Sequence, residues 1–381
     1  MTAAPLASVP ATVSPAARAG TGRSLLEFLA VGGLTPLCFL ASFFLRRTLG
    51  LSPSDYAVGF TAFYAAYVIN DPHFAVTYVL FYEDGRARGL GKAFGGAQRV
   101  RWLLVGVAVP VALAAWGAYG LVTRSAPALG LMMELMFALV GWHYVKQGFG
   151  VMITLAARRG LTFGKWERAV LLTHGFAGWA FAWANPAAAA REVESNGVVY
   201  TCLAHPALLD RVTQVIFFAS FAALVAMLVR KRRKEGPLPL LSPLTALLAS
   251  IWSWSVYSSI DPLVVYVTPA LHSLQYLYFV WLLRGNQAKE REGPPWFERS
   301  AKTRLGLLAV TALVLGFVLF HGAPTLLDSA LVTKRDRLMD TGPTPYFAAL
   351  YAFVNIHHYF MDHVIWRRDN PLTRYLRQGA S

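Results

Sequence analysis

The sequence predicts an all-α fold, a polytopic bundle of about ten transmembrane helices with a histidine-lined metal site in its core. The first observation is composition: 56% of the 381 residues are hydrophobic and only 14% are charged. With a mean hydropathy of +0.44, the chain is too apolar for a soluble protein of this length. The second is that apolar runs long enough to cross a bilayer recur along the chain. The third is that histidines and carboxylates interrupt several runs, where ionisable groups mark functional sites.

Ten apolar runs of about 20 residues are predicted to cross the membrane within a single integral membrane domain, residues 24–370. Pro72, inside the second run, predicts a kink there. The runs are residues 25–45, 55–83, 102–123, 127–156, 166–184, 209–229, 240–259, 261–283, 304–322 and 344–366.

Both ends of the chain are predicted to lie outside the membrane. Residues 1–23 are rich in Ala, Pro, Ser and Thr, which predicts a disordered tail and not a cleaved signal peptide. Residues 371–381 are predicted to form a second short tail. Lys and Arg concentrate in alternate loops, on the same side as both ends, with the densest run at residues 230–234. Both termini are therefore predicted to be cytoplasmic, in a bacterial inner membrane.

The net charge of +15 does not indicate a nucleic-acid partner, because the basic residues lie in short loops where membrane topology explains them. Cys38 and Cys202 match no zinc or redox spacing. The expected partners are the lipid bilayer and an apolar, lipid-like substrate that reaches the protein from it. The sequence leaves the oligomeric state open.

Histidines in four of the runs are predicted to lie at one depth. These are the second, fourth, eighth and tenth runs, which cross in the same direction, and a cytoplasmic arginine follows each histidine after 9 to 15 residues. The rise of a helix places all of them about 14 to 22 Å from the cytoplasmic edge. Facing helices that each offer an imidazole form a metal site in a bundle core. The predicted metal ligands are His73, His143, His272, His357 and His358.

Other polar residues accompany these histidines, mostly three or four positions away. Asp362 shares a helix face with His358 and is a predicted catalytic residue, together with Lys146 and Tyr276. Lys146 lies too deep to reach the interface, so it is expected to face a polar interior or to pair with Asp71 or Asp362. The residues expected to hydrogen-bond the imidazoles and fix their tautomers are Asn70, Asp71, Gln147, Gln275 and Asn355.

A buried histidine can also be a hydrogen-bonded packing residue, and that alternative stays beside each candidate ligand. His174, in the fifth run, is equally well interpreted as a packing residue or as a residue that orients a metal ligand. His205 and His321 are expected at the outer surface. The matched depth of the four runs is the observation that favours a metal site over packing.

Imidazole and carboxylate ligands without thiolates suit iron or zinc. The sequence favours iron, in a non-haem oxygenase or related oxidoreductase acting on an apolar lipid or isoprenoid-like substrate. Zinc would instead indicate a membrane lipid hydrolase, because zinc activates water. A proton, ion or solute transporter would use the same buried polar residues.

Four short blocks resemble the Brp/Blh-type bacterial carotenoid dioxygenases, polytopic enzymes that cleave β-carotene to retinal with a histidine-ligated iron. In order, the blocks are residues 72–74 (PHF), 143–144 (HY), 272–273 (HS) and 357–367 (HHYFMDHVIWR). The resemblance implies that iron is held by His73, His143, His272 and one of the adjacent pair at 357 and 358. The chain departs from the family pattern in having Phe74 after the first histidine and Tyr276 where that family has a second histidine.

Overall fold

A computed structural model describes the conformation of residues 21–50, 55–91, 94–184, 191–261, 264–290, 300–336 and 339–376. These residues are almost entirely helical, with one two-stranded hairpin. The predicted all-α class is thus confirmed, while most of the predicted N-terminal tail lies outside the described residues.

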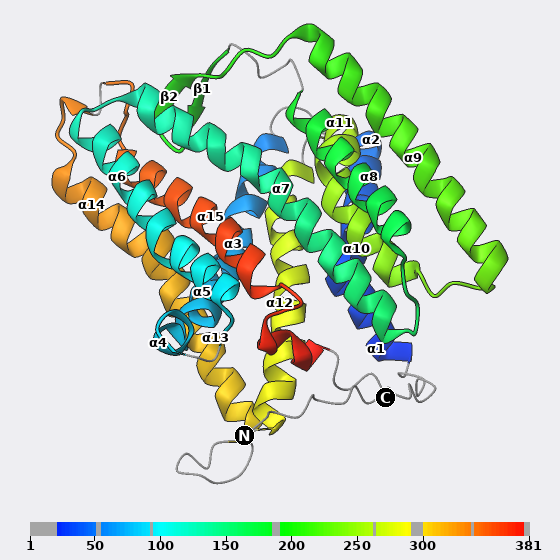
Figure 1. Cartoon of the computed structure of the whole chain (residues 1–381). Helices are drawn as coiled ribbons and strands as arrows, with labels where there is room; N and C mark the ends of the chain where they lie inside the picture. The colour runs from blue at the N-terminus through cyan, green and yellow to red at the C-terminus, as the bar shows by residue number, and fades with distance from the viewer. Residues whose placement is uncertain are drawn as a thin grey trace.

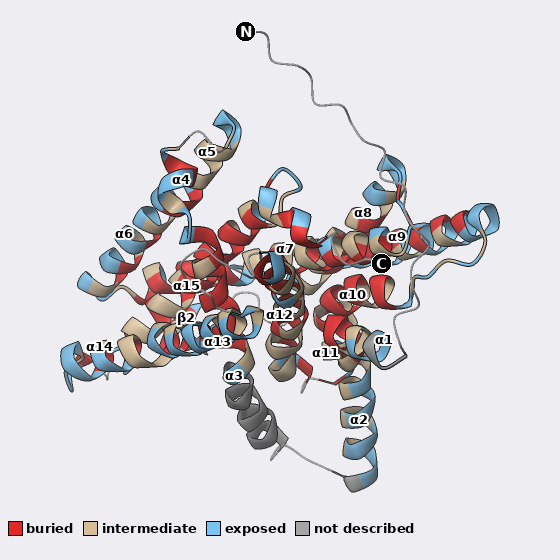
Figure 2. Ribbon diagram, turned by 90° about the horizontal axis from the view of Figure 1, so that it is seen from below, coloured by how far each residue is buried: buried red, intermediate tan, exposed pale blue. Residues whose placement is uncertain are grey.

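Four long helices form the centre of the bundle (Figure 1). They are α3 (Asp55–Tyr82), α7 (Ala126–Arg158), α12 (Val264–Glu290) and α15 (Pro345–Ile365). Helix α15 packs against both α7 and α3, and α12 packs along α3. Much of α7, α12 and α15 is buried (Figure 2), so polar side chains on their inner faces must find partners within the protein.

Two groups of helices flank this centre. On one side α10 (Leu241–Trp252) packs on α7, and α8 (Lys165–Trp183) pairs with α9 (Ala207–Glu235). On the other side α13 (Ala301–Phe317) packs on α3, and α6 (Val109–Val122) packs on α15 and α7. The remaining α-helices are α1 (Thr21–Phe28), α2 (Leu34–Leu49), α4 (Gly85–Gly89), α5 (Gly96–Leu103), α11 (Ser258–Ile260) and α14 (Ala323–Leu331).

The outer surface of the bundle is apolar, as a lipid-facing surface requires. Figure 2 shows long exposed faces on α2, α6, α9 and α14, and the exposed side chains include Val122 and Leu208. Among the described residues, five helical segments are long and apolar enough to cross a membrane. They are Ser24–Thr48, Gly96–Val122, Ala126–Arg158, Ala207–Glu235 and Ala301–Leu331. These segments support the integral membrane class, and each of the ten predicted runs coincides with a helix or an interrupted helical run.

Turns of π-helix interrupt four of the runs: η1 (Leu29–Gly33), η2 (Leu104–Ala108), η3 (Ser253–Tyr257) and η4 (Val318–Gly322). In η1, Gly32 has a φ of 143°, and a Cβ there would lie 2.9 Å from the Cβ of Ala249 on α10. Only glycine permits this approach. Gln275 on α12 donates hydrogen bonds to the carbonyls of Val31 (2.6 Å) and Ala246 (3.1 Å), which joins the first run to α10 and α12.

A β-hairpin and a 3-10 helix have no counterpart among the predicted elements. Strands β1 (Glu192–Ser195) and β2 (Val198–Thr201) pair antiparallel, and the hairpin that they form lies at the N-terminal end of α7 (Figure 1). After α15, the 3-10 helix η6 (Pro371–Leu376) buries Tyr375 and Leu376 in the core. Residues 371–376, at the start of the predicted second tail, therefore pack against the helices of the bundle.

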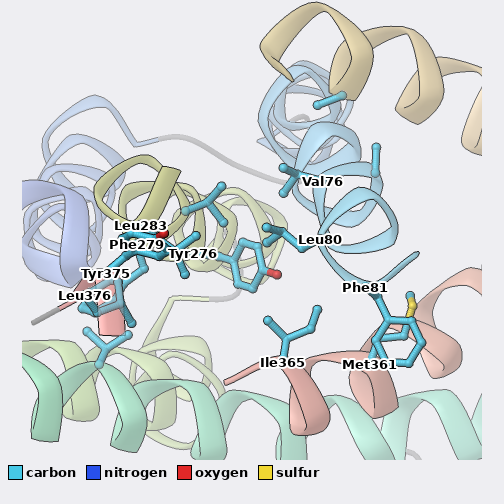
Figure 3. Packing of buried hydrophobic residues seen from close by; sticks show 14 of the residues in the cluster. Val76, Leu80, Phe81, Tyr276, Phe279, Leu283, Met361, Ile365, Tyr375 and Leu376 are labelled. Atoms are coloured by element: carbon cyan, nitrogen blue, oxygen red, sulfur yellow. The ribbon is translucent and has the colours of Figure 1, made fainter. Parts of the chain in front are cut away.

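One apolar cluster sets the rotation of the central helices. It joins α3, α12, α15 and η6 (Figure 3). Within it, the Tyr276 side chain extends from α12 into the space between α3 and α15. The cluster includes Val76, Leu80, Phe81, Tyr276, Phe279, Leu283, Met361, Ile365, Tyr375 and Leu376.

Candidate metal centre

Three imidazoles and one carboxylate meet in the buried centre of the bundle. They come from His73 on α3, His143 on α7, and His358 and Asp362 on α15, and each offers a ligand atom within 4.8 Å of the others. All four side chains are buried, His358 completely. The ring of His358 lies 4.4 Å from that of His73 and 4.9 Å from that of His143, measured between centroids. We call these four residues the His3Asp cluster.

Helix geometry explains the two ligands on α15. His358 and Asp362 are one turn apart and therefore share a face, with Nε2 of His358 3.4 Å from Oδ2 of Asp362. Nδ1 of His143 lies 3.8 Å from the same oxygen. Oδ2 is buried and has no hydrogen-bond partner among the described residues. This carboxylate oxygen is therefore directed at two of the three imidazoles.

The other oxygen of Asp362 is held by a chain of hydroxyl groups. The Tyr276 hydroxyl donates to Oδ1 at 2.9 Å, and Oγ1 of Thr77 lies 2.7 Å from the Tyr276 oxygen. The Thr77 hydroxyl also donates to the carbonyl oxygen of His73 at 3.1 Å, so it connects Tyr276 to the backbone of α3 beside the cluster. The chain from α3 through α12 to α15 fixes the carboxylate and leaves Oδ2 for the cluster.

A second chain of hydrogen bonds fixes the tautomer of His73. Oγ of Ser273 donates to Oδ1 of Asn70 at 2.8 Å and lies 2.9 Å from Nδ1 of His73. Because the serine hydroxyl has only one hydrogen, the His73 Nδ1–H must donate to Ser273. Nε2 of His73 then carries the lone pair, and no described residue offers this buried atom a hydrogen bond. A neutral imidazole binds a metal in this form, with its other nitrogen held by a protein acceptor.

The unpartnered atoms of the cluster test whether these residues fit a metal ion. Neither nitrogen of His358 has a hydrogen-bond partner among the described residues, and the same holds for Nε2 of His73 and Oδ2 of Asp362. An unsatisfied buried polar group costs about 1–3 kcal/mol, and a cation bound by Nε2 of His73, Oδ2 of Asp362 and one nitrogen of His358 would offset three of these four costs. Three imidazoles and a carboxylate suit non-haem iron and zinc alike. The cluster can therefore hold a metal ion.

His272, predicted as a ligand, lies beside the cluster. Its Nε2 is 3.0 Å from Nε2 of His143, and its ring stacks on Tyr144 with centroids 3.6 Å apart. The Gln147 amide nitrogen is 3.4 Å from Nδ1 of His272 and donates to Oε1 of Gln275 at 3.0 Å. An amide nitrogen only donates, so Nδ1 of His272 is the acceptor in that contact, and a neutral His272 then carries its hydrogen on Nε2 and donates it to Nε2 of His143. His272 then orients His143, and the two glutamines hold His272.

His357, the adjacent predicted ligand, points away from the cluster. Its Nδ1 is 3.0 Å from the Tyr78 hydroxyl and its Nε2 is 3.0 Å from the Val105 carbonyl oxygen. Both nitrogens therefore have partners outside the cluster. The structure brings His358 into the His3Asp cluster and leaves His357 out.

Lys146 is also not brought to the cluster. Its ammonium lies over the ring of Phe176 on α8, 5.7 Å from the centroid. The carboxylates expected to pair with it have other partners: Oδ2 of Asp71 is 2.8 Å from Nε2 of His321, and Asp362 accepts from Tyr276. His321, expected at the outer surface, lies against Asp71 with its side chain 35% exposed.

Asn355 acts on the cluster through a tyrosine. Its Oδ1 accepts a hydrogen bond from the Tyr359 hydroxyl at 3.1 Å, and its Nδ2 donates to the Tyr351 carbonyl at 2.8 Å. The Tyr359 ring stacks on His143 with centroids 4.8 Å apart. Asn355 thus supports the face of the His143 ring.

The two hydroxyl groups that complete these networks, Thr77 and Ser273, were not among the predicted site residues. Thr77 is one helical turn after His73, and this spacing is the signal that places it on the same face. Ser273 directly follows His272, and its contact with His73 depends on how α12 packs against α3. No protein-family model, curated protein or solved structure matched the chain. The functional argument therefore rests on the geometry of the cluster.

Proposed function

We propose that the protein is an integral membrane metalloenzyme, a non-haem iron oxygenase that acts on an apolar lipid or isoprenoid-like substrate. One observation carries the proposal: His73, His143, His358 and Asp362 converge in the buried centre of an apolar bundle, and four of their polar atoms lack hydrogen-bond partners among the described residues. Such an arrangement is expensive to maintain unless a cation occupies it.

The proposed placement is a bacterial inner membrane, with ten crossings and both termini in the cytoplasm. The apolar helices of the described residues support the membrane location. The orientation rests on the concentration of Lys and Arg in alternate loops, such as the run at residues 230–234. In this orientation the His3Asp cluster lies within the membrane, where a hydrophobic substrate can reach the protein from the lipid.

The residues of the cluster have distinct tasks in this proposal. His73, His143, His358 and Asp362 would hold iron, which supplies activation of O2 for oxidation of the substrate. Ser273 and Tyr276 keep His73 and Asp362 in the form and orientation that binding requires. Burial of all four ligand side chains excludes water from the reacting centre.

The surroundings of His358 favour an apolar substrate. The Phe74 ring lies 4.6 Å from the His358 ring, between centroids, and packs with Phe320 and Val354 in a buried cluster. Carbon surfaces next to the ligands suit a hydrocarbon. The resemblance of the four histidine blocks to the carotenoid dioxygenases supports an isoprenoid within that class.

Elemental analysis after extraction in a mild detergent tests the proposal. We expect about one iron per chain in the wild type and none in Asp362→Asn, which replaces an anionic ligand with a neutral amide. Oxygen uptake should follow the addition of a carotenoid in micelles and should be absent in the variant. Stoichiometric zinc without iron would instead indicate the lipid hydrolase. A metal-free wild type would contradict both enzymes and favour a transporter.

A further inference from the structure

A second polar site lies at the C-terminal end of α15, away from the His3Asp cluster. It is a pocket between α4, α5 and the segment that follows α15, and its lining includes Arg88, Arg101 and Arg367. Asp369 and the ring of Trp102 also line it. We call it the Arg88 pocket. Three guanidinium groups face one carboxylate there, so the pocket has an excess of positive charge.

Arg88 is the unusual member of this set. Its side chain is only 4% exposed, and its Nε has no hydrogen-bond partner among the described residues. The guanidinium lies over the Phe94 ring, 5.5 Å from the centroid, which supplies some attraction but no acceptor. A buried cation is costly unless it is paired and hydrogen-bonded. The Arg88 pocket therefore offers a buried cation whose Nε still needs an acceptor.

The neighbouring charges do not complete the pairing. Glu83 and Asp84, on the same segment, attract Arg88, while Arg284 on α12 repels it. The Glu83 carboxylate already accepts a hydrogen bond from Arg284. Of these two carboxylates, that of Glu83 is thus partly committed to another guanidinium, and that of Asp84 is exposed to solvent.

The other walls of the pocket are fixed by Asp369. Its Oδ2 accepts from Nη1 of Arg101 at 3.0 Å and its Oδ1 from Nε of Arg367 at 3.2 Å. Burial opposes ionisation of Asp369, but the charge of Arg367 and the hydrogen bond from Arg101 outweigh it and lower the pKa of this carboxyl group. The Gln98 amide also donates to the Asp369 carbonyl. These contacts tie α5 to the segment after α15 and hold Arg101 and Arg367 on one carboxylate beside the pocket.

The position of the pocket identifies the class of anion. Arg101 and Trp102 lie in the first turns of Gly96–Val122, a segment apolar enough to cross the membrane. The end of such a segment lies at the level of the lipid headgroups, where tryptophan is enriched. Basic pockets between membrane helices bind the headgroups of anionic lipids. We propose that the Arg88 pocket binds the phosphate of an anionic phospholipid, independently of the metal centre.

Thermal unfolding of the full chain in detergent tests this proposal, with added phosphatidylglycerol or phosphatidylcholine as the probes. Phosphatidylglycerol should raise the Tm of the wild type by about 3 °C, the effect of a ligand near 100 times its Kd on a chain of this size. Phosphatidylcholine should not. Arg88→Gln should lose the shift. Arg86→Gln is the matched control, because Arg86 lies on the same helix but is exposed, and it should keep the shift.

Three outcomes would overturn the proposal. The first is a wild type that phosphatidylglycerol stabilises no more than phosphatidylcholine does. The second is an Arg88→Gln protein with the full wild-type shift. The third is an equal shift with inorganic phosphate, which would assign the pocket to a free anion. If Arg88→Gln does not fold, Arg367→Gln in the same lining decides: loss of the shift supports the lipid site, and retention of the full shift contradicts it.

Discussion

Two regions of the bundle bury histidines, and they treat the imidazole nitrogens differently. In the flank formed by α8, α9 and α10, Nδ1 of His174 is 3.1 Å from the Ser220 hydroxyl, and Trp252 donates to its Nε2 at 3.2 Å. In the centre, neither nitrogen of His358 has a hydrogen-bond partner in the part of the chain that the structure describes. Both rings are fully buried. Burial alone therefore does not distinguish the two histidines, whereas the presence or absence of hydrogen-bond partners on their nitrogens does.

The largest expected difference between the two regions is in metal content. His358→Ala should remove the metal, because it deletes a ligand and leaves Asp362 facing an open position. His174→Ala should keep it, and so should His357→Ala, whose nitrogens contact Tyr78 and Val105. Elemental analysis of the three purified variants checks this. Iron retained in His358→Ala, or lost in His174→Ala, would contradict the distinction.

A smaller effect is expected from the hydroxyl that holds Asp362. Tyr276→Phe should lower metal affinity about 10- to 100-fold, the usual cost of losing a group that orients a ligand. Tyr78→Phe is the matched control: it removes the tyrosine hydroxyl that contacts His357 and should leave metal affinity unchanged. Competition with a chelator measures both variants. Equal affinities would show that the hydrogen bond to Oδ1 of Asp362 does not position the ligand.

In the absence of metal, we expect the substitution in the flank to lower the free energy of unfolding more than the substitution in the centre does. His174→Leu should lower the free energy of unfolding by about 2 kcal/mol, because Trp252 loses its buried acceptor. His358→Leu, measured with a chelator present, should be neutral or stabilising, since it removes two unpartnered nitrogens. Denaturant titration in mixed micelles compares them. A similar loss in both variants would mean that the His358 nitrogens have partners after all.

The smallest effect is expected at the serines that contact the two buried rings. Ser273→Ala removes the acceptor of the His73 Nδ1–H and should reduce metal affinity about tenfold. Ser220→Ala makes the matching change beside His174 and should not alter affinity. The same chelator competition measures the pair. An unchanged affinity in Ser273→Ala would show that another group sets the His73 tautomer.

The sequence could predict the features of the site that depend on a single helix. Rise per residue placed His73, His143 and His358 at a common depth, and the rotation of a helix placed His358 and Asp362 on one face. The distances of 4.8 Å or less among these ligand atoms agree with both expectations. The ten apolar runs likewise coincide with helical segments because both follow from local composition.

The features that depend on packing between helices could not be predicted. The rotation of α12 against α7 decides that His272 contacts His143 instead of joining the cluster. Packing of α8 supplies the Phe176 ring beneath Lys146, so the expected ion pair is not needed to hold its charge. His357 lies outside the cluster because its nitrogens contact Tyr78 and Val105. Both residues are far from α15 in the sequence, so these contacts could not be predicted.

The contacts around the kink at Gly32 indicate when, during synthesis of the chain, the N-terminal run packs against the other helices. The Val31 carbonyl accepts from Gln275, 244 residues further along the chain, and the Gly32 backbone rests on Ala249. The first run leaves the ribosome long before Ala249 and Gln275 have been synthesised. The segment synthesised first thus completes its packing late, and the same glutamine contacts Gln147 beside His272. Formation of the His3Asp cluster and final docking of the N-terminal run are therefore expected to occur together, once α12 has entered the membrane.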